Sequence, residues 1–445
     1  MRNVKLGLSL LLLVPAGLWL LADTLVPRPF TYFSFREVFV QLTGVLAIVA
    51  MSAAMVLATR PTWLESHLGG LDKIYRLHKW LGIAALAVST VHWWWAYGTK
   101  LMVGWGWLER PQHGPGPGGP TAAGIEAWLR GQRGLAENVG EWAFYAAAIL
   151  LVLALVPRFP YHLFKKVHVW LAAVFLALVY HALVLTRFSY WSQPIGWLLA
   201  VLLVAGTVSA ILALLGRIGA GRKVQGAVED LVHYPSLQVL ETSIRLDEGW
   251  RGHEPGQFAF VTSDRNEGAH PYTIASAWDP AERRIVFITK ALGDHTRRLR
   301  DRLKPGLPVT VEGPYGCFTF HDDRPVQIWV GAGIGITPFI ARMKHLARHP
   351  QPQAIHLFHP TADYEQAAID KLTADAKAAG VALHVLVSPR DGLLTGDRIR
   401  KAVPSWREAS LWFCGPVAFG RSLRLDFRHA GLPDKRFHQE LFQMR

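Results

Sequence analysis

The first half of this chain contains six long apolar stretches, and these restrict its fold more than any other feature. They cover residues 6–22, 37–58, 77–97, 138–156, 166–185 and 195–215. A helix that crosses the hydrocarbon core of a bilayer needs about 20 apolar residues. Every backbone polar group inside that core must find a partner, which an α-helix provides within a single segment. We therefore expect an all-α, six-helix membrane bundle over residues 1–221.

The first apolar stretch has features of both a signal peptide and a membrane helix. Arg2 and Lys5 precede a leucine-rich run, as they do in secretory signals. No convincing small-residue cleavage site follows, and Trp19 and Asp23 come after the leucines. We expect a helix that is retained in the membrane.

Basic residues are concentrated in the segments that join or follow these stretches. They are Arg60, Lys73, Arg76, Lys79, Arg158, Lys165, Lys166, Arg217, Arg222 and Lys223. Loops on the cytoplasmic side of a membrane carry an excess of Lys and Arg. We therefore expect a protein of a bacterial inner membrane, surrounded by lipid, with both termini and the second half of the chain in the cytoplasm. Segment 98–137, which contains the run Gly114–Pro120, is then on the outer side.

Composition argues against a nucleic-acid-binding site and against cysteine-based disulfide or iron–sulfur sites. The net charge of +14 would point to nucleic acid in another protein, but here the membrane loops account for it, and we expect no nucleic-acid partner. Cys317 and Cys414 are the only cysteines in the sequence. Two cysteines provide neither a disulfide framework nor a cysteine-bound iron–sulfur site.

Four histidines lie within the third and fifth apolar stretches, and they form two pairs. His78 and His92 belong to the third stretch, His168 and His181 to the fifth. Ionisable side chains at membrane depth are costly, and imidazole is a common axial ligand of haem iron. The two helices run in the same direction, so His78 matches His168 in depth and His92 matches His181. This predicts an inner and an outer haem; histidines that only pack between helices, or that contact headgroups, are the alternative.

The spacing of the histidines fits one helix better than the other. His78 and His92 are 14 residues apart, which gives about 21 Å of rise and about 320° of rotation on an ideal helix, so they share a face. His168 and His181 are 13 apart, which gives about 19 Å but roughly 220° of rotation. Either the fifth helix is locally tightened, or the two haems meet it from different directions. Phe175, midway between them, is either a packing residue or lies between the haems.

The second half of the chain reads as a soluble α/β protein and begins with short β-like runs. These are Leu237–Leu246, Gln257–Thr262, Arg284–Lys290 and Pro308–Glu312. Runs of this length between turn residues predict a small antiparallel barrel, which we assign to residues 222–322. The segment 270–276 (HPYTIAS) places an aromatic ring before alternating hydroxyl groups on an extended strand. It can cover a planar ring and bond to its edge, although Tyr and Thr are also ordinary strand residues.

A glycine-rich segment, residues 331–339 (GAGIGITPF), follows the apolar run Gln327–Val330 and precedes the helical stretch Phe339–Arg348. A strand that enters such a turn before a helix exposes backbone N–H groups to a phosphate. Taken alone, the turn could be an ordinary tight loop. Further strands alternate with helical stretches downstream, at Ile355–His359, Ala382–Ser388 and Leu411–Cys414. We therefore predict a parallel nucleotide-binding sheet over residues 323–445.

In order and kind, these motifs resemble those of the NADPH oxidase and ferric reductase superfamily along nearly the whole chain. They are the two histidine pairs, HPYTIAS at 270–276, LGDHT at 292–296, EGPYG at 312–316, GAGIGITPF at 331–339, CGP at 414–416 and FHQELF at 437–442. The resemblance implies a ferric-reductase-like membrane domain joined to a ferredoxin-reductase-like module. That module comprises a β-barrel FAD domain and an α/β domain for NADPH or NADH.

The resemblance also implies which residues bind FAD. The flavin is expected along the segment that contains His270, Pro271, Tyr272, Thr273 and Ser276. Within it, Tyr272 lies against the ring and Thr273 near its reactive edge. The FAD diphosphate is expected beside Lys290, Gly293 and Thr296.

For the nicotinamide dinucleotide, the family pattern implies a pyrophosphate cradle formed by Gly331, Gly333, Gly335, Thr337 and Pro338. The nicotinamide is expected beside Cys414, Gly415 and Pro416. In the family an aromatic residue near the C-terminus covers the flavin until nicotinamide displaces it. Phe442 is the candidate here, with a packed C-terminal aromatic as the alternative.

Two departures from the family pattern bear on specificity. Members that select NADPH tend to carry an arginine after the second strand of the nucleotide domain, where this chain has residues 359–361 (HPT). Arg390 could replace it, since guanidinium suits phosphate, so the choice between NADPH and NADH stays open. Oxygen-reducing members also carry an arginine that Arg36 matches, and a histidine where this chain has Ala96. Arg36 could instead anchor the helix at the headgroups.

The sequence thus predicts a transmembrane oxidoreductase. Electrons would pass from cytoplasmic NAD(P)H through FAD and two haems b to an outer acceptor, either oxygen, giving superoxide, or a ferric chelate. Two histidines leave no open position on iron, so the acceptor is expected to react at the haem edge. The alternative is a membrane electron-delivery subunit that feeds quinone or a periplasmic redox partner.

Overall fold

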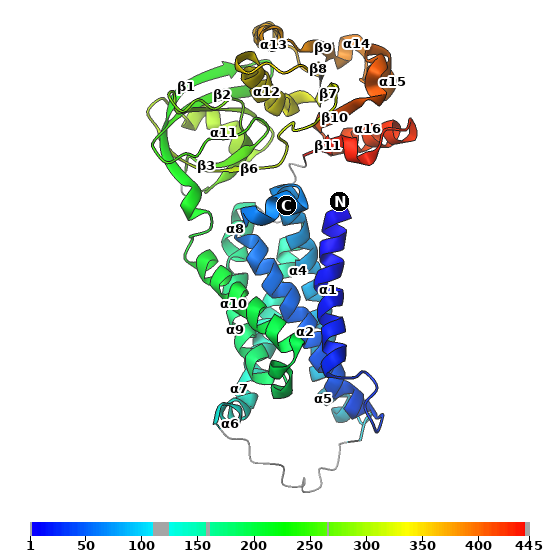
Figure 1. Ribbon diagram of the computed structural model, residues 1–445. Helices are drawn as coiled ribbons and strands as arrows, with labels where there is room; N and C mark the ends of the chain where they lie inside the picture. Colours follow the sequence, from blue (N-terminus) through cyan, green and yellow to red (C-terminus); the bar gives the residue numbers. More distant parts are fainter. Residues whose placement is uncertain (1, 110–123, 157–160, 265–266, 441–445) are drawn as a thin grey trace. The chain divides into compact units, whose positions relative to one another are not determined.

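The computed structural model describes residues 2–109, 124–156, 161–264 and 267–440, which form two compact units (Figure 1). The first contains Met1–Leu64 and Lys73–Ile218, and we call it the helical unit. The second contains Glu65–Asp72 and most of the chain after Gly219, and we call it the sheet unit. The predictions for Gly114–Pro120, Arg158 and Phe442 fall outside the described residues.

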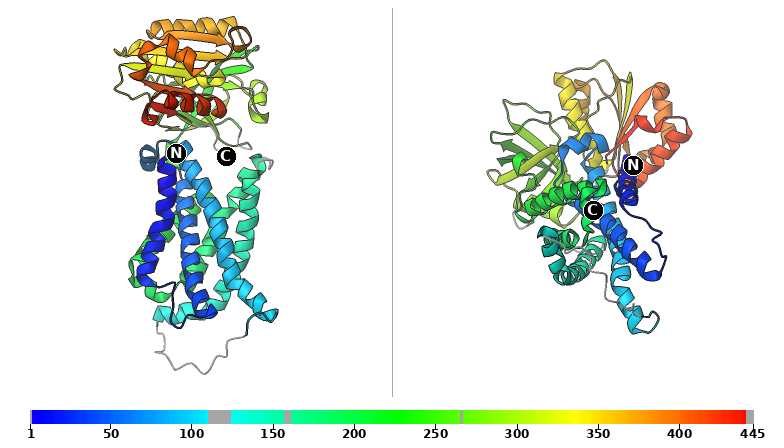
Figure 2. Two further views of the ribbon diagram at one scale, coloured as in Figure 1. Left: turned by 90° about the vertical axis from the view of Figure 1, so that its right-hand side faces the viewer. Right: turned by 60° about the horizontal axis from the view of Figure 1, so that its bottom comes forward.

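The helical unit is built from long helices that run side by side (Figures 1 and 2). They are α1 (Arg2–Ala22), α2 (Tyr32–Ala58), α4 (Leu71–Trp93), α7 (Arg133–Leu155), α9 (Trp170–Leu185) and α10 (Pro194–Leu214), with the shorter α5 (Thr99–Gly104), α6 (Gly124–Gly131) and α8 (Tyr161–His168).

Five helical segments among the described residues are long and apolar enough to cross a membrane. They are Asn3–Ala22, Tyr32–Ala58, Arg133–Leu155, Lys166–Leu185 and Pro194–Leu214, which match five of the six predicted stretches. The remaining stretch corresponds to α4, a helix of 23 residues whose first turns carry Asp72, Lys73, Arg76 and Lys79. Whether α4 also crosses the membrane, which a six-helix bundle requires, therefore stays a prediction.

The core of the helical unit lies between α2, α9 and α10. Phe175 of α9 is fully buried, and Gly206 of α10 leaves room for its ring. A Cβ atom at Gly206 would be 2.7 Å from Phe175 Cζ and 3.2 Å from the Cα of Ser52 on α2. Phe175 thus packs against α2 and α10, and a position between the two haems stays a prediction.

The fifth predicted span is divided into two helices at Val169. Helix α8 ends at His168 and α9 begins at Trp170. The N–H group of Ala172 donates to the carbonyl of Val169 (3.0 Å), three residues earlier instead of the usual four. This tightened turn lies between His168 and His181, but one such turn adds only about 60° to the roughly 220° of an ideal helix. Both explanations of the 13-residue spacing therefore stay open.

The third predicted span also departs from a regular helix. A π-helical turn, η1 (Trp94–Gly98), follows α4 and leads into α5. Arg36 of α2 donates from Nε to the carbonyl of Trp95 (2.9 Å) and from its terminal nitrogen to that of Ala96 (2.8 Å). Because a π turn shifts the backbone hydrogen bonds by one residue, the guanidinium supplies donors to two of its carbonyls.

The first sheet of the sheet unit is antiparallel, with strand order β4-β3-β6-β1-β2-β5. The strands are β1 (Lys223–Tyr234), β2 (Val239–Leu246), β3 (Phe258–Thr262), β4 (His270–Thr273), β5 (Arg284–Lys290) and β6 (Pro308–Tyr315). Helix α11 (Asp294–Arg302) follows β5. Among the described residues, one isolated antiparallel bridge links Ile274, which follows β4, to Phe287 in the middle of β5. The predicted antiparallel strands are confirmed, whereas a closed barrel is not.

The second sheet is parallel, as predicted, with strand order β11-β10-β7-β8-β9. Its strands are β7 (Val326–Gly331), β8 (Ala354–Thr361), β9 (Ala382–Val387), β10 (Ala409–Cys414) and β11 (Phe437–Gln439). The connecting segments form α12 (Thr337–Arg348), α13 (Gln366–Ala378), α14 (Ser388–Asp391), α15 (Gly396–Ala402) and α16 (Val417–His429). Strand β11 begins the C-terminal FHQELF motif, which the sequence did not identify as a strand.

Residues Glu65–Asp72 belong to the sheet unit, although they come between two helices of the helical unit in the sequence. They include the end of the short helix α3 (Thr62–Leu68). The carboxylate of Glu65 accepts hydrogen bonds from the backbone N–H groups of Gly316 (2.7 Å) and Leu71 (3.1 Å). Burial raises the pKa of this carboxyl group, and the two N–H donors oppose that effect. The EGPYG motif is thus held to this segment through Gly316.

We predict that Gly206→Ala destabilises the helical unit. The added methyl group meets Phe175 and the Ser52 backbone at distances that require them to shift, and overpacking of this kind costs about 1–3 kcal/mol. Gly17→Ala is the control, because nothing lies within 4 Å of a Cβ atom there. The apparent melting temperature in detergent should fall for the first variant only; a fall that is equal in both would contradict the packing described.

Candidate cofactor sites

The structure brings the four membrane histidines together in the predicted pairs. The ring centroids of His78 and His168 are 6.0 Å apart, with an interplanar angle of 68°. Those of His92 and His181 are 6.2 Å apart, at 87°. A metal ion bound end-on by two imidazoles, about 2 Å from each nitrogen, separates the ring centroids by about 6 Å. Each pair is therefore spaced to hold one metal ion between its rings.

Backbone carbonyl groups fix the orientation of three of these rings. The Nδ1–H of His78 donates to Ala54 (2.9 Å), that of His92 to Val40 (3.1 Å) and that of His181 to Ala136 (2.8 Å). A bond of this kind determines the tautomer, so that Nε2 carries the free lone pair. None of these three Nε2 atoms has a hydrogen-bond partner among the residues that the structure describes. Histidines that served only to link helices would be expected to use both nitrogens.

His168 is bonded differently from the other three histidines. Its Nδ1 is buried and has no hydrogen-bond partner in the described part of the chain. Its ring packs against Phe164, with the centroids 4.8 Å apart. Packing on α8 therefore sets the direction of this ring.

Two glycines provide the space that the outer pair needs. A Cβ atom at Gly140 of α7 would be 2.0 Å from His181 Nδ1, and one at Gly44 of α2 would be 3.1 Å from His92 Cε1. Any side chain at Gly140 would displace the ring of His181. The residues present thus fit a haem at each pair in the spacing of the rings, and three of the four rings have the tautomer that leaves Nε2 free.

Arg36 has a structural role that neither sequence-based reading predicted. Besides the two carbonyl groups of the π turn, its Nε also reaches Thr99 Oγ1 (3.0 Å). Trp95, whose carbonyl it binds, packs its ring against Tyr32, Phe35 and Phe39. Arg36 therefore holds the π turn, and a role toward an electron acceptor stays a prediction.

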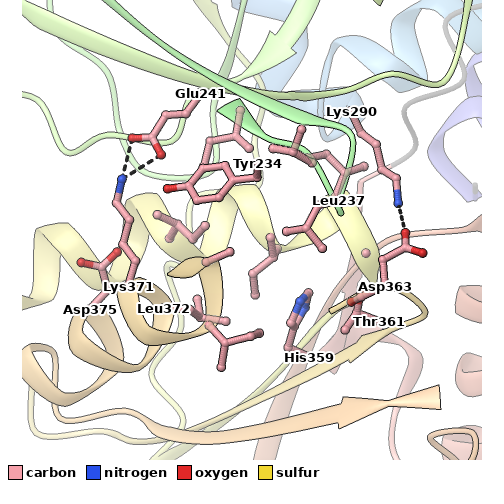
Figure 3. Close-up of a pocket in the computed structure, with 18 of the residues that line it drawn as sticks. Tyr234, Leu237, Glu241, Lys290, His359, Thr361, Asp363, Lys371, Leu372 and Asp375 are labelled. Carbon is pink, nitrogen blue, oxygen red and sulfur yellow. Dashed lines mark hydrogen bonds and ion pairs between the residues drawn. The ribbon is translucent and has the colours of Figure 1, made fainter. Parts of the chain in front are cut away.

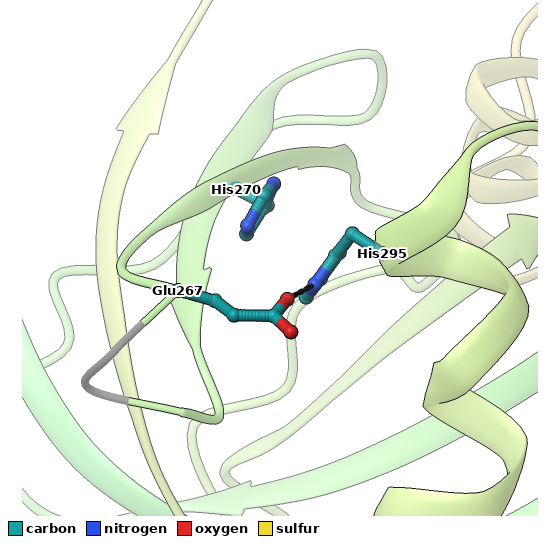
Figure 4. Close-up of side chains that lie close together, drawn as sticks. All are labelled: Glu267, His270 and His295. Atoms are coloured by element: carbon teal, nitrogen blue, oxygen red, sulfur yellow. Dashed lines mark hydrogen bonds and ion pairs between the residues drawn. The ribbon is translucent and has the colours of Figure 1, made fainter. Parts of the chain in front are cut away.

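The segment predicted to bind the flavin begins as the outer strand β4, where Pro271 can stand without donating to the ladder. Figure 4 shows the side chains of Glu267, His270 and His295, which lie close together beside it. The rings of His270 and His295 are stacked, 3.6 Å apart and nearly parallel. His295 Nδ1 bonds to the Glu267 carboxylate, and His295 Nε2 lies 2.8 Å from the hydroxyl oxygen of Tyr272.

These bonds give the hydroxyl group of Tyr272 a defined direction. The bond from His295 lowers the pKa of Glu267, and Arg302 contributes in the same sense. Glu267 accepts a hydrogen bond from His295 Nδ1, and His295 Nε2 bonds to the Tyr272 hydroxyl group. A neutral His295 ring accepts the Tyr272 proton at Nε2, whereas a charged ring donates to the Tyr272 oxygen.

The same three side chains could be considered a metal site, because their ligand atoms lie within 4.8 Å of one another. Two features oppose this. In parallel stacked rings the nitrogen lone pairs do not converge on one point, and the guanidinium of Arg302 already binds Glu267. A hydrogen-bonded chain that positions Tyr272 fits the geometry better. Sequence reasoning missed Glu267 and His295, although His295 lies within the LGDHT motif.

The remaining residues predicted to bind FAD have hydrogen-bond or ion-pair partners of their own. Ser276 Oγ accepts from the N–H of Val286 (3.1 Å), and Thr296 Oγ1 accepts from the N–H of Gly293 (3.1 Å). The Gly293–Thr296 bond caps α11, whose first turn can still offer N–H groups to a diphosphate. Lys290 ends β5 and pairs with Asp363 (2.7 Å).

The glycine-rich turn and the CGP motif lie side by side at the carboxyl ends of β7 and β10, which are neighbouring strands. The Ala332 N–H donates to the Cys414 carbonyl (2.9 Å), and a Cβ atom at Gly335 would be 2.3 Å from that oxygen. Gly333 and Gly415 have positive φ angles, which suit glycine. Thr337 closes the turn through its own hydroxyl group, next to Pro338 in the first turn of α12. The close approach of the two loops therefore requires glycine.

Two residues with predicted roles are placed less directly. The Cys414 side chain is 1% exposed, and burial raises the pKa of its thiol well above the usual range, so it is a neutral thiol. Pro416 and Gly415 follow it at the end of β10. Arg390 lies on α14 and binds its neighbour Asp391 (3.0 Å) with 66% of its side chain exposed. The structure does not bring Arg390 to the glycine-rich turn.

Two family models match this chain. Residues 43–179 match "Ferric reductase like transmembrane component", and residues 229–319 match "FAD-binding domain". The first match includes His78, His92 and His168 and ends two residues before His181, and the second includes the segment 270–276.

Among characterised proteins, the chain is 30% identical over 209 residues to an "NADPH oxidoreductase" of Mycobacterium tuberculosis, covering 44% of this chain and 55% of that protein. It is 26% identical to a "Flavohemoprotein" of a Burkholderia species, covering 42% and 51%. It is 27% identical to a superoxide-generating NADPH oxidase heavy chain of Dictyostelium discoideum, covering 47% and 43%. The chain thus spans about half the length of the relatives it matches.

Among solved structures, a cytochrome P450 reductase of Amycolatopsis is 23% identical, with a TM-score of 0.43, covering 50% of this chain and 70% of that one.

We predict that Gly140→Ala removes the ligand held by His92 and His181. The methyl group would lie 2.0 Å from His181 Nδ1, so the ring must move away from its partner. Purified protein should then contain about half of the normal haem, since each iron needs both axial imidazoles. Pyridine haemochrome absorbance per chain measures this.

Gly134→Ala is the matched control on the same helix, because nothing lies within 4 Å of a Cβ atom there. It should retain the full haem content. Equal haem content in the two variants would contradict the assignment of the outer haem to His92 and His181.

Proposed function

Because this chain is a ferric-reductase-like and NADPH-oxidase-like membrane protein with a ferredoxin-reductase-type module, we propose that it carries electrons across a bilayer. The donor is NAD(P)H, and the path runs through FAD and two haems b to an acceptor on the opposite side. The observation that carries this proposal is the pair of imidazole sites at 6.0 and 6.2 Å, on helices that precede a FAD-binding domain.

Each cofactor has a set of residues suited to hold it. His78 and His168 would hold the inner haem, and His92 and His181 the outer haem. Tyr272 and Thr273 would lie along the flavin, as the family resemblance implies. When bound, the flavin accepts a hydride from the nicotinamide and releases electrons singly, and each haem iron carries one electron at a time.

The residues of the chain supply orientation and control of access. Carbonyl groups on neighbouring helices aim three of the imidazoles, and packing aims the fourth. A haem held by both histidines of a pair would have no open position on its iron, so an outer acceptor would react at the haem edge. The hydrogen bonds that join Glu267, His295 and Tyr272 position the Tyr272 hydroxyl group beside the proposed flavin site. Glycines at the carboxyl ends of β7 and β10 allow the dinucleotide backbone to approach closely.

Two observations lead us to place a ferric chelate before oxygen as the acceptor. Arg36, which matches an arginine of oxygen-reducing relatives, uses its guanidinium to hold the π turn. Position 96 is alanine where those relatives carry a histidine. A membrane electron-delivery subunit that feeds quinone or a periplasmic protein is the alternative function.

The proposal is tested with purified protein in liposomes that contain a ferric chelate or a superoxide detector. NADH or NADPH is added outside, so that only outward-facing nucleotide sites respond. We expect reduction of the enclosed chelate, with less signal that superoxide dismutase abolishes. A superoxide signal with negligible iron reduction would reverse our order of acceptors, and reduction of neither would favour the delivery subunit.

We further predict that His168→Ala separates the two halves of the reaction. Loss of an inner ligand should stop reduction of the enclosed chelate, because electrons can no longer enter the helical unit through that site. NAD(P)H should still reduce a soluble dye outside the liposomes, since the flavin and nucleotide sites are intact. His429→Ala, on the exposed end of α16, is the control that should retain both activities. Transmembrane reduction that persists in His168→Ala would contradict the proposed path.

A further inference from the structure

A pocket opens in the sheet unit beyond the carboxyl end of β8, the second strand of the nucleotide domain in sequence (Figure 3). In parallel α/β sheets, nucleotides bind in the crevice beyond the carboxyl ends of the strands. Gly333 and Ile334 of the glycine-rich turn lie in its wall, together with Thr361, the last residue of β8, and Asp363, which follows the strand. Apolar side chains form much of the rest: Leu237, Val239, Ile288, Ile340, Ile369 and Leu372.

The charges of this pocket are balanced. Lys371 binds both carboxylate oxygens of Glu241 at 2.8 Å, and Lys290 binds Asp363 at 2.7 Å (Figure 3). Burial raises the pKa of Asp375, and the nearby charge of Lys344 opposes that effect. The pocket therefore contains three basic and three acidic side chains, with an acidic group beside each lysine.

A balanced pocket is unsuited to a 2′-phosphate. Such a phosphate monoester carries about 1.5 to 2 negative charges near neutral pH, and its binding sites in proteins are rich in unpaired arginine or lysine. Here β8 ends at Thr361 and is followed by Ala362 and Asp363, without an arginine. Arg390, the other candidate, binds Asp391 on an exposed helix.

Asp363 has the position of a ribose-binding acid. An acidic side chain at the end of the second strand can accept a hydrogen bond from a ribose 2′-hydroxyl, and it repels a 2′-phosphate. The turn that carries it is fixed, because Thr361 Oγ1 donates to the Asp363 carbonyl (2.9 Å). We infer that Asp363 selects the dinucleotide with a free 2′-hydroxyl, NADH, over NADPH. This deepens the proposed function and depends on it.

Lys290 explains how Asp363 is held when the dinucleotide site is empty. Its ammonium group, on β5, bonds to the carboxylate of Asp363 from the first sheet. Lys290 is also the residue proposed to bind the FAD diphosphate, which would compete for the same ammonium group. With that group directed to the diphosphate, the carboxylate of Asp363 is left to accept from the ribose. The 2′-position thus meets a negative charge in the loaded protein.

The test uses full-length protein in detergent and two probes, ADP-ribose and its 2′-phosphorylated form. Calorimetry should show that the wild-type protein binds ADP-ribose at least about tenfold more tightly than the 2′-phosphorylated probe. The reason is that the Asp363 carboxylate accepts a hydrogen bond from the 2′-hydroxyl group and repels the 2′-phosphate. In Asp363→Asn the preference should shrink by about tenfold. Asp370→Asn, an exposed position on α13 outside the pocket, should leave the preference unchanged. Flavin reduction by NADH and by NADPH, compared as kcat/KM, should follow the same order.

A double variant separates Asp363 from its partner. If Asp363 acts directly, Lys290→Gln combined with Asp363→Asn should keep the reduced preference of the single variant. A return to the wild-type preference would show that the freed Lys290, and not Asp363, controls selection, which overturns the inference. Tighter binding of the 2′-phosphorylated probe to the wild-type protein overturns it as well. If neither dinucleotide reduces the flavin, the proposed function fails instead.

Discussion

The interior of a membrane penalises every polar group that lacks a partner, and the helical unit is organised around that constraint. Carbonyl groups at Ala54, Val40 and Ala136 receive the Nδ1–H groups of three histidines from other helices. Two carbonyl groups of the π turn receive the guanidinium of Arg36. The same bonds that lower the cost of burial also orient these three imidazoles and leave the second nitrogen of each ring without a hydrogen bond in the described part of the chain. The requirement for partners is thus compatible with the two proposed haem sites.

The regular parts of the molecule could be predicted from the sequence. Apolar length identified the helices, and turn residues between short β-like runs identified the two sheets. Local departures from regular geometry could not be predicted, because they depend on contacts between distant segments. The π turn after α4 is held by Arg36, about sixty residues earlier in the chain, and the turn at Val169 left only an unexplained spacing. Likewise, Glu267 and Asp363 are ordinary acidic residues in the sequence, and they gain meaning only from His295 and Lys290.

The two sheets of the sheet unit are joined by charged pairs, Lys290 with Asp363 and Lys371 with Glu241, around a largely apolar pocket. Pairs that are partly exposed to solvent contribute little to stability. Their importance is in the electrostatic character that they give the pocket. A pocket without surplus positive charge can favour a ligand with fewer negative charges, even when the backbone cradle for pyrophosphate is unchanged.

The division of the fifth span at Val169 places His168 and His181 on separate helices. Because α9 is packed around Phe175, its rotation is constrained by the whole core, whereas α8 is a short element with its own side-chain contacts. Substitutions in α8 can therefore re-aim the ring of His168 without disturbing His181. If each histidine pair carries a redox centre, the reduction potential of the inner centre can change in evolution while that of the outer centre is preserved. Single substitutions in α8 could then change the difference in reduction potential between the two centres.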